Sequence, residues 1–359
     1  METVFVAMSG GMDSSFAAYI LKQKGYDVVG ITYQLLPDFM KDANGQKACC
    51  AMETVNRARK VAADLSIRHF VMDLREDFER YVIERFIEEY KAGRTPNPCV
   101  LCNKYIKFSS FFRKAMSMGG EKVATGHYAV IEDTPDGPVL KKSRDRLKDQ
   151  SYFLYPIERD VLRAVLFPLG EEIKGELKEK SHLVHTDYRK VKESQDICFV
   201  SGNDYREFLN RFIPLRKGPA YFTDGTLLGY HEGTHLYTLG QRKGLGIPFR
   251  EPLYVVEIRS EENTLILGTK GHLNGRRLVA GEINLFGPES GQSFGKVRYR
   301  QEDVPCAYRI SGSAMEVEFD KPIHAITPGQ SVVLYQDDIV VAGGVIETVQ
   351  QEGCAANKC

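Results

Sequence analysis

Short apolar runs alternate with segments of helical periodicity over the first 200 residues of the chain. The runs at 4–8, 28–33, 69–72 and 122–125 are too short for surface helices and are typical of buried parallel strands. Between them, apolar side chains recur three and four positions apart, as on one face of a helix, at 16–21, 55–65, 83–90 and 108–115. This alternation predicts an α/β domain with a parallel, Rossmann-like sheet covered on both faces.

The pattern changes after about residue 205, where turn residues become frequent and the apolar runs become short and alternating. The runs at 253–258 and 264–268 predict a hairpin, and those at 307–310, 315–319, 331–335 and 339–346 predict an antiparallel sheet or small barrel. We therefore expect an α/β domain over 1–205, a small central domain over 206–275 and an antiparallel β-barrel over 276–359.

Composition narrows the class of protein. The 359 residues include 48 Lys+Arg and 48 Asp+Glu, which argues against a nucleic-acid binder that acts by bulk charge but permits local basic patches. No apolar run approaches the roughly 20 residues of a membrane span, and the acidic second residue is not typical of a secretory signal. The eight cysteines are too sparse for a secreted disulfide scaffold. We expect a cytoplasmic protein with no membrane partner.

The clearest local motif is Ser-Gly-Gly-Met-Asp-Ser-Ser at 9–15, between the first strand and the first helix. Gly10 and Gly11 allow close approach of a ligand to the backbone, and the N–H groups at a helix start bind anions. Asp13 is suited to hold Mg²⁺ against phosphate oxygens. A glycine turn with Ser14 as a helix cap is the structural alternative. The motif lacks the lysine of the Gly-x-x-x-x-Gly-Lys phosphate loop, so it does not indicate a γ-phosphoryl-transferring ATPase.

A second motif places two cysteines at a predicted helix start. Asn97 is a good cap and Pro98 suits the first helical position, so Cys99 and Cys102 lie in or just after the first turn. A helix N-terminus lowers the pKa of a thiol from ~8.5 to about 3.5–7.5 and thereby favours the thiolate. The third motif, Ser-Gln-Asp-Ile-Cys-Phe at 194–199, taken alone favours a strand with Cys198 in the core.

Taken together the motifs carry a family resemblance. They occur in one order over nearly the whole chain: SGGMDSS at 9–15, TPNPCVLCNK at 95–104, IKF at 106–108, ATGHY at 124–128, KDQSYFL at 148–154, SQDICF at 194–199, YTLGQRKGL at 237–245 and RYRQ at 298–301. The chain resembles the bacterial tRNA-specific 2-thiouridylases, which belong to the N-type ATP pyrophosphatases. The resemblance implies an adenine nucleotide α-hydrolase-like first domain, a small central domain that binds tRNA and a C-terminal β-barrel.

The resemblance also implies an activity, substrates and partners. It implies ATP-dependent 2-thiolation of the wobble uridine, U34, in the tRNAs for Lys, Glu and Gln. Adenylation of the uracil C2 oxygen is followed by sulfur transfer from a cysteine persulfide, giving 2-thiouridine, AMP and pyrophosphate. ATP and Mg²⁺ are required, and a cysteine desulfurase or a sulfur-relay protein supplies the sulfur.

Residue roles carry over by motif. Cys102 is implied to be the nucleophile and Cys198 the persulfide carrier, with a transient disulfide between them. The residues implied to bind ATP are Ala7, Met8, Ser9, Gly10, Gly11, Met12, Asp13, Ser14, Tyr33 and Gly126. The residues implied to contact tRNA are Asn97, Pro98, Cys99, Asp149, Gln150, Ser151, Arg298 and Tyr299.

One position departs from a common form of the family, which has aspartate where this chain has Cys99. The substitution raises the alternative that Cys99, Cys102 and Cys198 hold a [4Fe–4S] cluster that carries the sulfur. Two further alternatives are an adenylating pyrophosphatase acting on a small metabolite and an RNA-binding protein without catalysis. Cys49, Cys50, Cys306, Cys354 and Cys359 receive no role.

Two charged segments are interpreted differently. The run at 141–148 has five basic residues and one acid, and its place beside KDQSYFL favours phosphate contacts. Residues 174–180 mix both signs and predict an ordinary solvated helix face.

Overall fold

The structure is a computed structural model that describes residues 1–40, 52–184, 197–200 and 204–351. The chain divides into two compact units: the first comprises Met1–Ile83, Pro98–Asn203 and Asp338–Val340, and the second comprises Glu84–Asn97, Asp204–Asp337 and Val341–Cys359. No helix in the described ranges is long and apolar enough to cross a membrane. The three-domain division stays a prediction.

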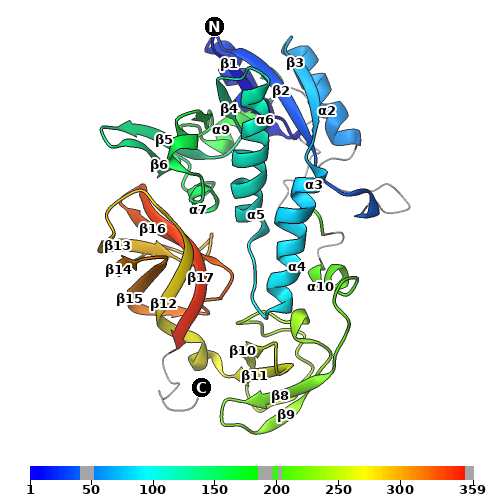
Figure 1. Cartoon of the computed structure of the whole chain (residues 1–359), viewed down its shortest axis with the longest axis vertical. Helices are drawn as coiled ribbons and strands as arrows, with labels where there is room; N and C mark the ends of the chain where they lie inside the picture. Colours follow the sequence, from blue (N-terminus) through cyan, green and yellow to red (C-terminus); the bar gives the residue numbers. More distant parts are fainter. Residues whose placement is uncertain (41–51, 185–196, 201–203, 352–359) are drawn as a thin grey trace. The chain divides into compact units, whose positions relative to one another are not determined.

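The first unit is built on a parallel sheet, as predicted. Its strands run in the order β3-β2-β1-β4-β7 (Figure 1), and their bounds are β1 Thr3–Ala7, β2 Asp27–Gln34, β3 Arg68–Asp73, β4 Lys122–Ala124 and β7 Val165–Leu166. Strand β1 pairs with β2 on one side and β4 on the other, and Val4 and Val6 are fully buried. A central strand needs apolar residues on both faces, which is why its sequence is an uninterrupted apolar run.

Helices α1 (Met12–Gln23) and α2 (Met52–Asp64) supply the other side of this core. Phe16 and Ala17 of α1 and Val61 of α2 are buried in the same hydrophobic cluster as the β1 side chains. Helix α1 connects β1 to β2 directly. The loop that starts α1 therefore lies at the carboxyl edge of the sheet, where ligands bind in open α/β folds.

A long continuous helix follows residue 97. It consists of α5 (Pro98–Leu101), a stretch of π-helix η3 (Cys102–Phe111) and α6 (Phe112–Ser117), drawn in teal in Figure 1. Before it, α3 (Arg75–Phe78) leads into a second π-helical stretch, η2 (Glu79–Ile83). The other helices of the first unit are α7 Ser151–Leu154, α8 Arg159–Leu162 and α9 Lys174–Glu179.

An antiparallel hairpin interrupts the α/β pattern. Strands β5 (Ala129–Thr134) and β6 (Gly137–Lys142) pair around a tight turn in which Gly137 has φ +107°. This hairpin was not predicted, although Pro-Asp-Gly at 135–137 is a turn signal. Lys141 and Lys142, the first two residues of the basic run at 141–148, end strand β6.

The second unit contains helix α4 (Glu84–Lys91), helix α10 (Tyr205–Leu209) and two sheets. The smaller sheet has the order β10-β11-β8-β9, with bounds β8 Gly218–Phe222, β9 Leu227–His231, β10 Tyr254–Arg259 and β11 Thr264–Gly268. The predicted hairpin is present as the antiparallel pair β10–β11.

The remaining strands close into an antiparallel barrel. Their order is β12-β15-β14-β13-β16-β17, and β17 pairs back with β12. Their bounds are β12 Asn274–Leu285, β13 Ser290–Lys296, β14 Val304–Ser311, β15 Ala314–His324, β16 Ser331–Gln336 and β17 Ile339–Gln351. Alternate side chains such as Val317 and Leu334 fill the interior together with Cys306. The predicted fold class is confirmed.

Candidate active site

The glycine loop between β1 and α1 is shaped by its own hydrogen bonds. Gly10 has φ +67°, and a Cβ there would lie 2.6 Å from the carbonyl oxygen of Thr54. The backbone N–H of Ser9 donates to Ser14 Oγ at 3.1 Å, and Ser14 Oγ donates to the carbonyl of Gly11 at 3.0 Å. The loop thus wraps the start of α1 closely and needs glycine at position 10.

The segment after β4 packs against the same helix start. A Cβ on Gly126 would lie 2.7 Å from the carbonyl carbon of Asp13 and 2.8 Å from the backbone nitrogen of Ser14. Any larger residue would push this segment away from the loop. The structure therefore places Gly126 beside the glycine loop, as the two predicted ATP-binding roles require.

Asp13 is held by two partners that come from distant parts of the chain. The Tyr128 hydroxyl donates to Oδ1 at 3.0 Å, and the Lys174 ammonium donates to Oδ2 at 2.9 Å. The Lys174 side chain is only 10% exposed and the Asp13 side chain 32%. The expectation that 174–180 is an ordinary solvated face is wrong at Lys174, because the first residue of α9 turns into the loop and pairs with its carboxylate.

Lys174 is itself anchored through the backbone. Its N–H donates to Asp145 Oδ2 at 3.0 Å, so an acidic residue of the basic run 141–148 caps the start of α9. Two features of the sequence agree with these contacts, although neither predicts them. Asp145 is the one acidic residue in a basic run, and Lys174 stands at a helix start, where the helix macrodipole disfavours a cation. A carboxylate partner compensates for that position.

Tyr33, at the end of β2, lies beside the thiol helix. Its ring is 5.1 Å from that of Phe111, and its hydroxyl is buried without a hydrogen-bond partner in the described chain. Burial raises the pKa of the Tyr33 phenol well above its usual value, and the negative charge of Cys102 raises it further. Tyr33 therefore remains a protonated donor close to Cys102.

The helix that carries the cysteines begins at Pro98, as predicted. Cys99 is exposed, whereas Cys102 is half-buried and is the first residue of the π-helical stretch η3. π-Helical turns are rare and occur often at functional sites. Within this helix, Cys102 is less exposed than Cys99, and its charge acts on Tyr33.

Cys198 occupies an exposed turn. The N–H of Val200 donates to the carbonyl of Ile197 at 3.0 Å, and Phe199 is buried with its ring 5.8 Å from that of Phe78. The interpretation of the third motif as a strand with a core cysteine is therefore wrong: Phe199 takes the core position and Cys198 points to solvent. Residues 194–196 lie outside the described chain.

The two thiol-bearing segments pack against one support. Phe78, which contacts Phe199, ends α3, and Tyr81 in the following η2 stacks on Tyr105 of η3 with ring centroids 5.1 Å apart. Cys102 begins that same η3 stretch. The α3–η2 segment is therefore the common neighbour of the Cys198 turn and of the Cys102 helix.

The predicted tRNA-binding residues differ in how far they are exposed to solvent. Asp149 and Ser151 are buried, and Ser151 Oγ donates to Asp149 Oδ2 at 2.7 Å. Gln150 exchanges hydrogen bonds with the backbone of Tyr128 at 2.8 and 2.9 Å. In the second unit, Arg298 is exposed and donates to the carbonyl of Ala325 at 2.9 Å. Tyr299 next to it is half-buried.

A metal or cluster site would need several ligands together. Among the described residues no group of three or more His, Cys, Asp or Glu side chains could hold a metal ion. Cys99, Cys102 and Cys198 all lie in the described chain, so their arrangement does not fit a [4Fe–4S] cluster. For Mg²⁺ held with ATP, Asp13 offers a carboxylate at the phosphate loop, which fits the chemistry of that ion.

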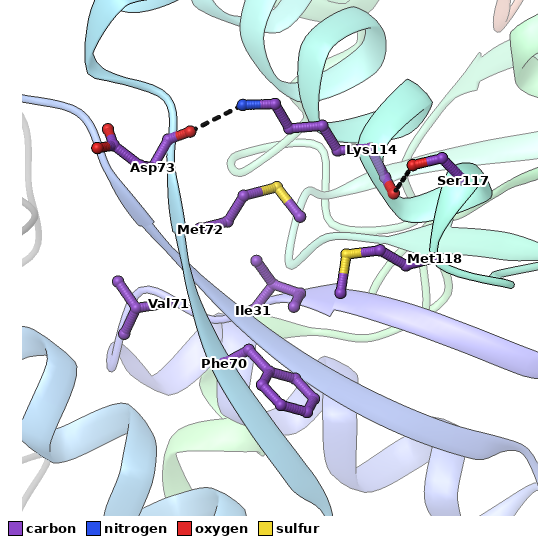
Figure 2. Close-up of a pocket in the computed structure, with 8 residues that line it drawn as sticks. All are labelled: Ile31, Phe70, Val71, Met72, Asp73, Lys114, Ser117 and Met118. Atoms are coloured by element: carbon purple, nitrogen blue, oxygen red, sulfur yellow. Dashed lines mark hydrogen bonds between the residues drawn. The ribbon is translucent and has the colours of Figure 1, made fainter.

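A separate groove lies at the sheet edge. A recess of about 310 Å³ lies between β3, β2 and α6, and Phe70, Met72 and Met118 are among its lining side chains (Figure 2). Lys114 donates to the carbonyl oxygen of Asp73 across one end of it, at 2.9 Å. None of the predicted site residues lines this groove, so the candidate active site is the glycine loop with the two thiol segments.

Family models cover the chain. One described as the tRNA methyl transferase HUP domain matches residues 2–202, the corresponding PRC-barrel domain matches 206–269, and the aminomethyltransferase beta-barrel domain matches 276–346. A glycine loop at the carboxyl edge of a sheet that the HUP model matches is typical of the nucleotide-dependent α/β enzymes.

Curated relatives are more specific than these descriptions. A protein described as tRNA-specific 2-thiouridylase MnmA from Lachnoclostridium phytofermentans is 42% identical over 357 residues, covering 96% of this chain and 99% of that protein. One from Halothermothrix orenii is 41% identical over 355 residues, covering 97% and 99%. The chain belongs to the tRNA-specific 2-thiouridylase family.

A solved 4-thiouridine synthetase–RNA complex with bound ATP is a weaker match. It aligns with 59% of this chain and 50% of its own at 19% identity, with a TM-score of 0.36. This similarity is too low to support any residue assignment.

Proposed function

We propose that this protein catalyses ATP-dependent 2-thiolation of U34 in the tRNAs for Lys, Glu and Gln in the cytoplasm, releasing AMP and pyrophosphate. One observation carries the proposal. The first unit combines a phosphate-type glycine loop with two thiol segments that share the α3–η2 support. The 2-thiouridylase relatives cover almost the whole chain, and their name supplies the substrate and the product.

The nucleotide half of the reaction belongs to the glycine loop. Loop residues 7–14 bind the ATP phosphates through backbone N–H groups, while Tyr33 and Gly126 frame the adenosine. The uracil C2 oxygen attacks the α-phosphorus, the bond to pyrophosphate breaks, and the oxygen becomes part of AMP, which is a good leaving group. Asp13 would hold Mg²⁺ together with ATP, and the ion would supply charge neutralisation for the pyrophosphate.

The sulfur half uses the two thiols. The terminal sulfur of a Cys198 persulfide attacks C2, and the C2–O bond breaks to release AMP. The Cys102 thiolate then attacks the Cys198 sulfur, forming a Cys102–Cys198 disulfide and leaving the outer sulfur on C2 as 2-thiouridine. A thiol reductant must reduce the disulfide before the next turnover. The exposure of Cys198 supports delivery of sulfur by a desulfurase or relay protein.

Three sets of residues serve RNA binding in this proposal. Asn97 and Cys99 face the target base at the start of the cysteine helix, and the buried Pro98 sets the direction of that start. Asp149, Gln150 and Ser151 act through the turn that they build, because Asp149 and Ser151 are buried in the structure. Arg298 and Tyr299 supply a guanidinium for phosphate and a ring for stacking.

The test is mass spectrometry of U34 after incubation of tRNA with the protein, ATP, Mg²⁺ and a persulfide source. Cys198→Ser and Cys102→Ser should form no 2-thiouridine. Cys306→Ala is the matched control, because burial raises the pKa of the Cys306 thiol to about 12 and keeps it unreactive in the barrel. Substantial product from either of the first two variants would contradict the mechanism.

The alternatives have their own outcomes. Cluster-borne sulfur would require iron in the anaerobically purified active protein, and the arrangement of the three cysteines does not favour it. A pyrophosphatase acting on a small metabolite would release pyrophosphate without tRNA, and a purely RNA-binding protein would consume no ATP.

A further inference from the structure

A chain of three polar groups lies between the cysteine helix and the end of β4. The Lys107 ammonium is 3.1 Å from His127 Nε2, and His127 Nδ1 is 2.7 Å from Thr125 Oγ1. An ammonium only donates hydrogen bonds, so Nε2 is the acceptor and Nδ1 carries the proton that is donated to Thr125. The contacts therefore specify the neutral Nδ1–H form of the imidazole.

The surroundings of His127 preserve that form. Its ring lies 6.1 Å from the ring of Phe108 and 6.0 Å from that of Phe167. Burial lowers the pKa of His127 well below its usual value, and the charge of Lys107 lowers it further. The imidazole consequently stays an acceptor at neutral pH.

A neutral partner orients Lys107 without cancelling its charge. The ammonium of Lys174 has a different kind of partner, because it pairs with the carboxylate of Asp13 at 2.9 Å. An ion pair of that kind already satisfies the cation. An ammonium anchored on a neutral imidazole keeps its full charge for an anion that arrives later.

Lys107 is connected both to the helix that carries Cys102 and to the segment beside the glycine loop. It follows Cys102 by five residues in η3, which is about one turn of a π-helix with i→i+5 hydrogen bonds. Its partner His127 directly follows Gly126, which abuts the glycine loop at Asp13 and Ser14. Lys107 thus belongs to the helix of the thiol and is tied to the segment beside the phosphate loop.

We propose that Lys107 is a catalytic cation that contacts the α-phosphate during adenylation, and that His127 is the positioning residue that aims it. The inference rests on the proposed function. The α-phosphorus is bonded in turn to the pyrophosphate, which the loop holds, and to the uracil oxygen, whose carbon must face the thiols. The transferring group therefore lies between those two regions, and the loop itself has no lysine.

The experiment compares variants in single-turnover release of pyrophosphate from ATP with tRNA present. Lys107→Met should lower the rate about 100–1000-fold with little change in the KM for ATP, because the contact is strongest when charge develops. Lys107→Arg should recover part of the rate. His127→Phe keeps an aromatic ring but loses the acceptor, and a misaimed ammonium should cost about 100-fold. Lys114→Met, on the same helix, is the matched control and should retain the rate.

Each alternative outcome is distinct. A Lys107→Met protein that releases pyrophosphate at the wild-type rate overturns the inference. The inference is also overturned if Lys107→Met lowers the thermal stability of the protein and Lys107→Arg does not restore the rate, because that result would indicate a structural role. Cys198→Ser should still release pyrophosphate while forming no 2-thiouridine. A wild-type protein that releases pyrophosphate but never forms 2-thiouridine would refute the proposed function instead and leave the Lys107 comparison valid.

Discussion

Replacing Lys174 by methionine tests the interaction that ties α9 to the glycine loop. Methionine keeps the length and most of the apolar stem of the side chain but removes the ammonium. Among the described residues, the Tyr128 hydroxyl, at 3.0 Å, then remains the side-chain partner of the Asp13 carboxylate. We expect the loop and the start of α9 to lose stability together.

The magnitude follows from distance and burial. Unit charges 2.9 Å apart attract by about 6 kcal/mol at an effective dielectric constant of ~20. Desolvation of the ammonium, whose side chain is 10% exposed, offsets much of this attraction. Fully buried pairs cost about 3–5 kcal/mol to break and exposed pairs about 0.2–1 kcal/mol. With Asp13 at 32% exposure, we expect a loss of about 1–3 kcal/mol.

The assay is native-state hydrogen exchange of the full-length protein, read at the amides of α1 and α9. Lys174→Met and Asp13→Asn should each increase exchange there, and the double variant should show less than the sum because the pair is shared. Lys174→Arg should lie near wild type. Additive effects, or unchanged exchange in Lys174→Met, would refute the view that this ion pair stabilises the loop.

The remaining predictions concern three positions. Gly126→Ala should raise the KM for ATP at least ~10-fold in kinetic assays, because its Cβ would meet backbone at 2.7 Å, while Gly175→Ala, with nothing within 4 Å, should not. The pKa of His127 is lower in the folded than in the unfolded protein, so the unfolded chain binds more protons at acid pH. The free energy of unfolding therefore falls as the pH drops below about 6.5. His127→Gln should reduce that fall in urea titrations between neutral and acid pH. Phe199→Ala removes a buried ring from Phe78 and should lower 2-thiouridine formation while pyrophosphate release persists; loss of both would contradict the assignment.

Much of the architecture could be predicted from periodicity. The strand at β1 is an unbroken apolar run, and α1 shows Phe16 and Ala17 on one face, because each element has only one way to bury these side chains. The β10–β11 hairpin was equally clear. The β5–β6 hairpin was missed because its alternation is short and runs into a basic segment, so the turn at Gly137 was the only local signal.

Some residues of the candidate site could likewise be predicted from the sequence, and others could not. The glycine loop, Cys102 and the resemblance to 2-thiouridylases were accessible from the sequence. Lys174 was not, because its partner Asp13 is 161 residues away and the flanking charges look like a solvated face. The third motif taken alone favoured Cys198 in the core, because a short motif cannot tell which of two neighbouring apolar side chains, Cys198 or Phe199, turns inward.

The sequence by itself determined the elements and the chemistry available, because helical and strand periodicity, glycine and proline signals and thiol spacing are local properties. Only the tertiary structure decided which distant groups meet: Lys174 at Asp13, Lys107 at His127, and Phe199 at Phe78. Such contacts depend on how strands are ordered and helices packed over long separations, and no local pattern records them. The charge state and direction of each site residue follow from those contacts.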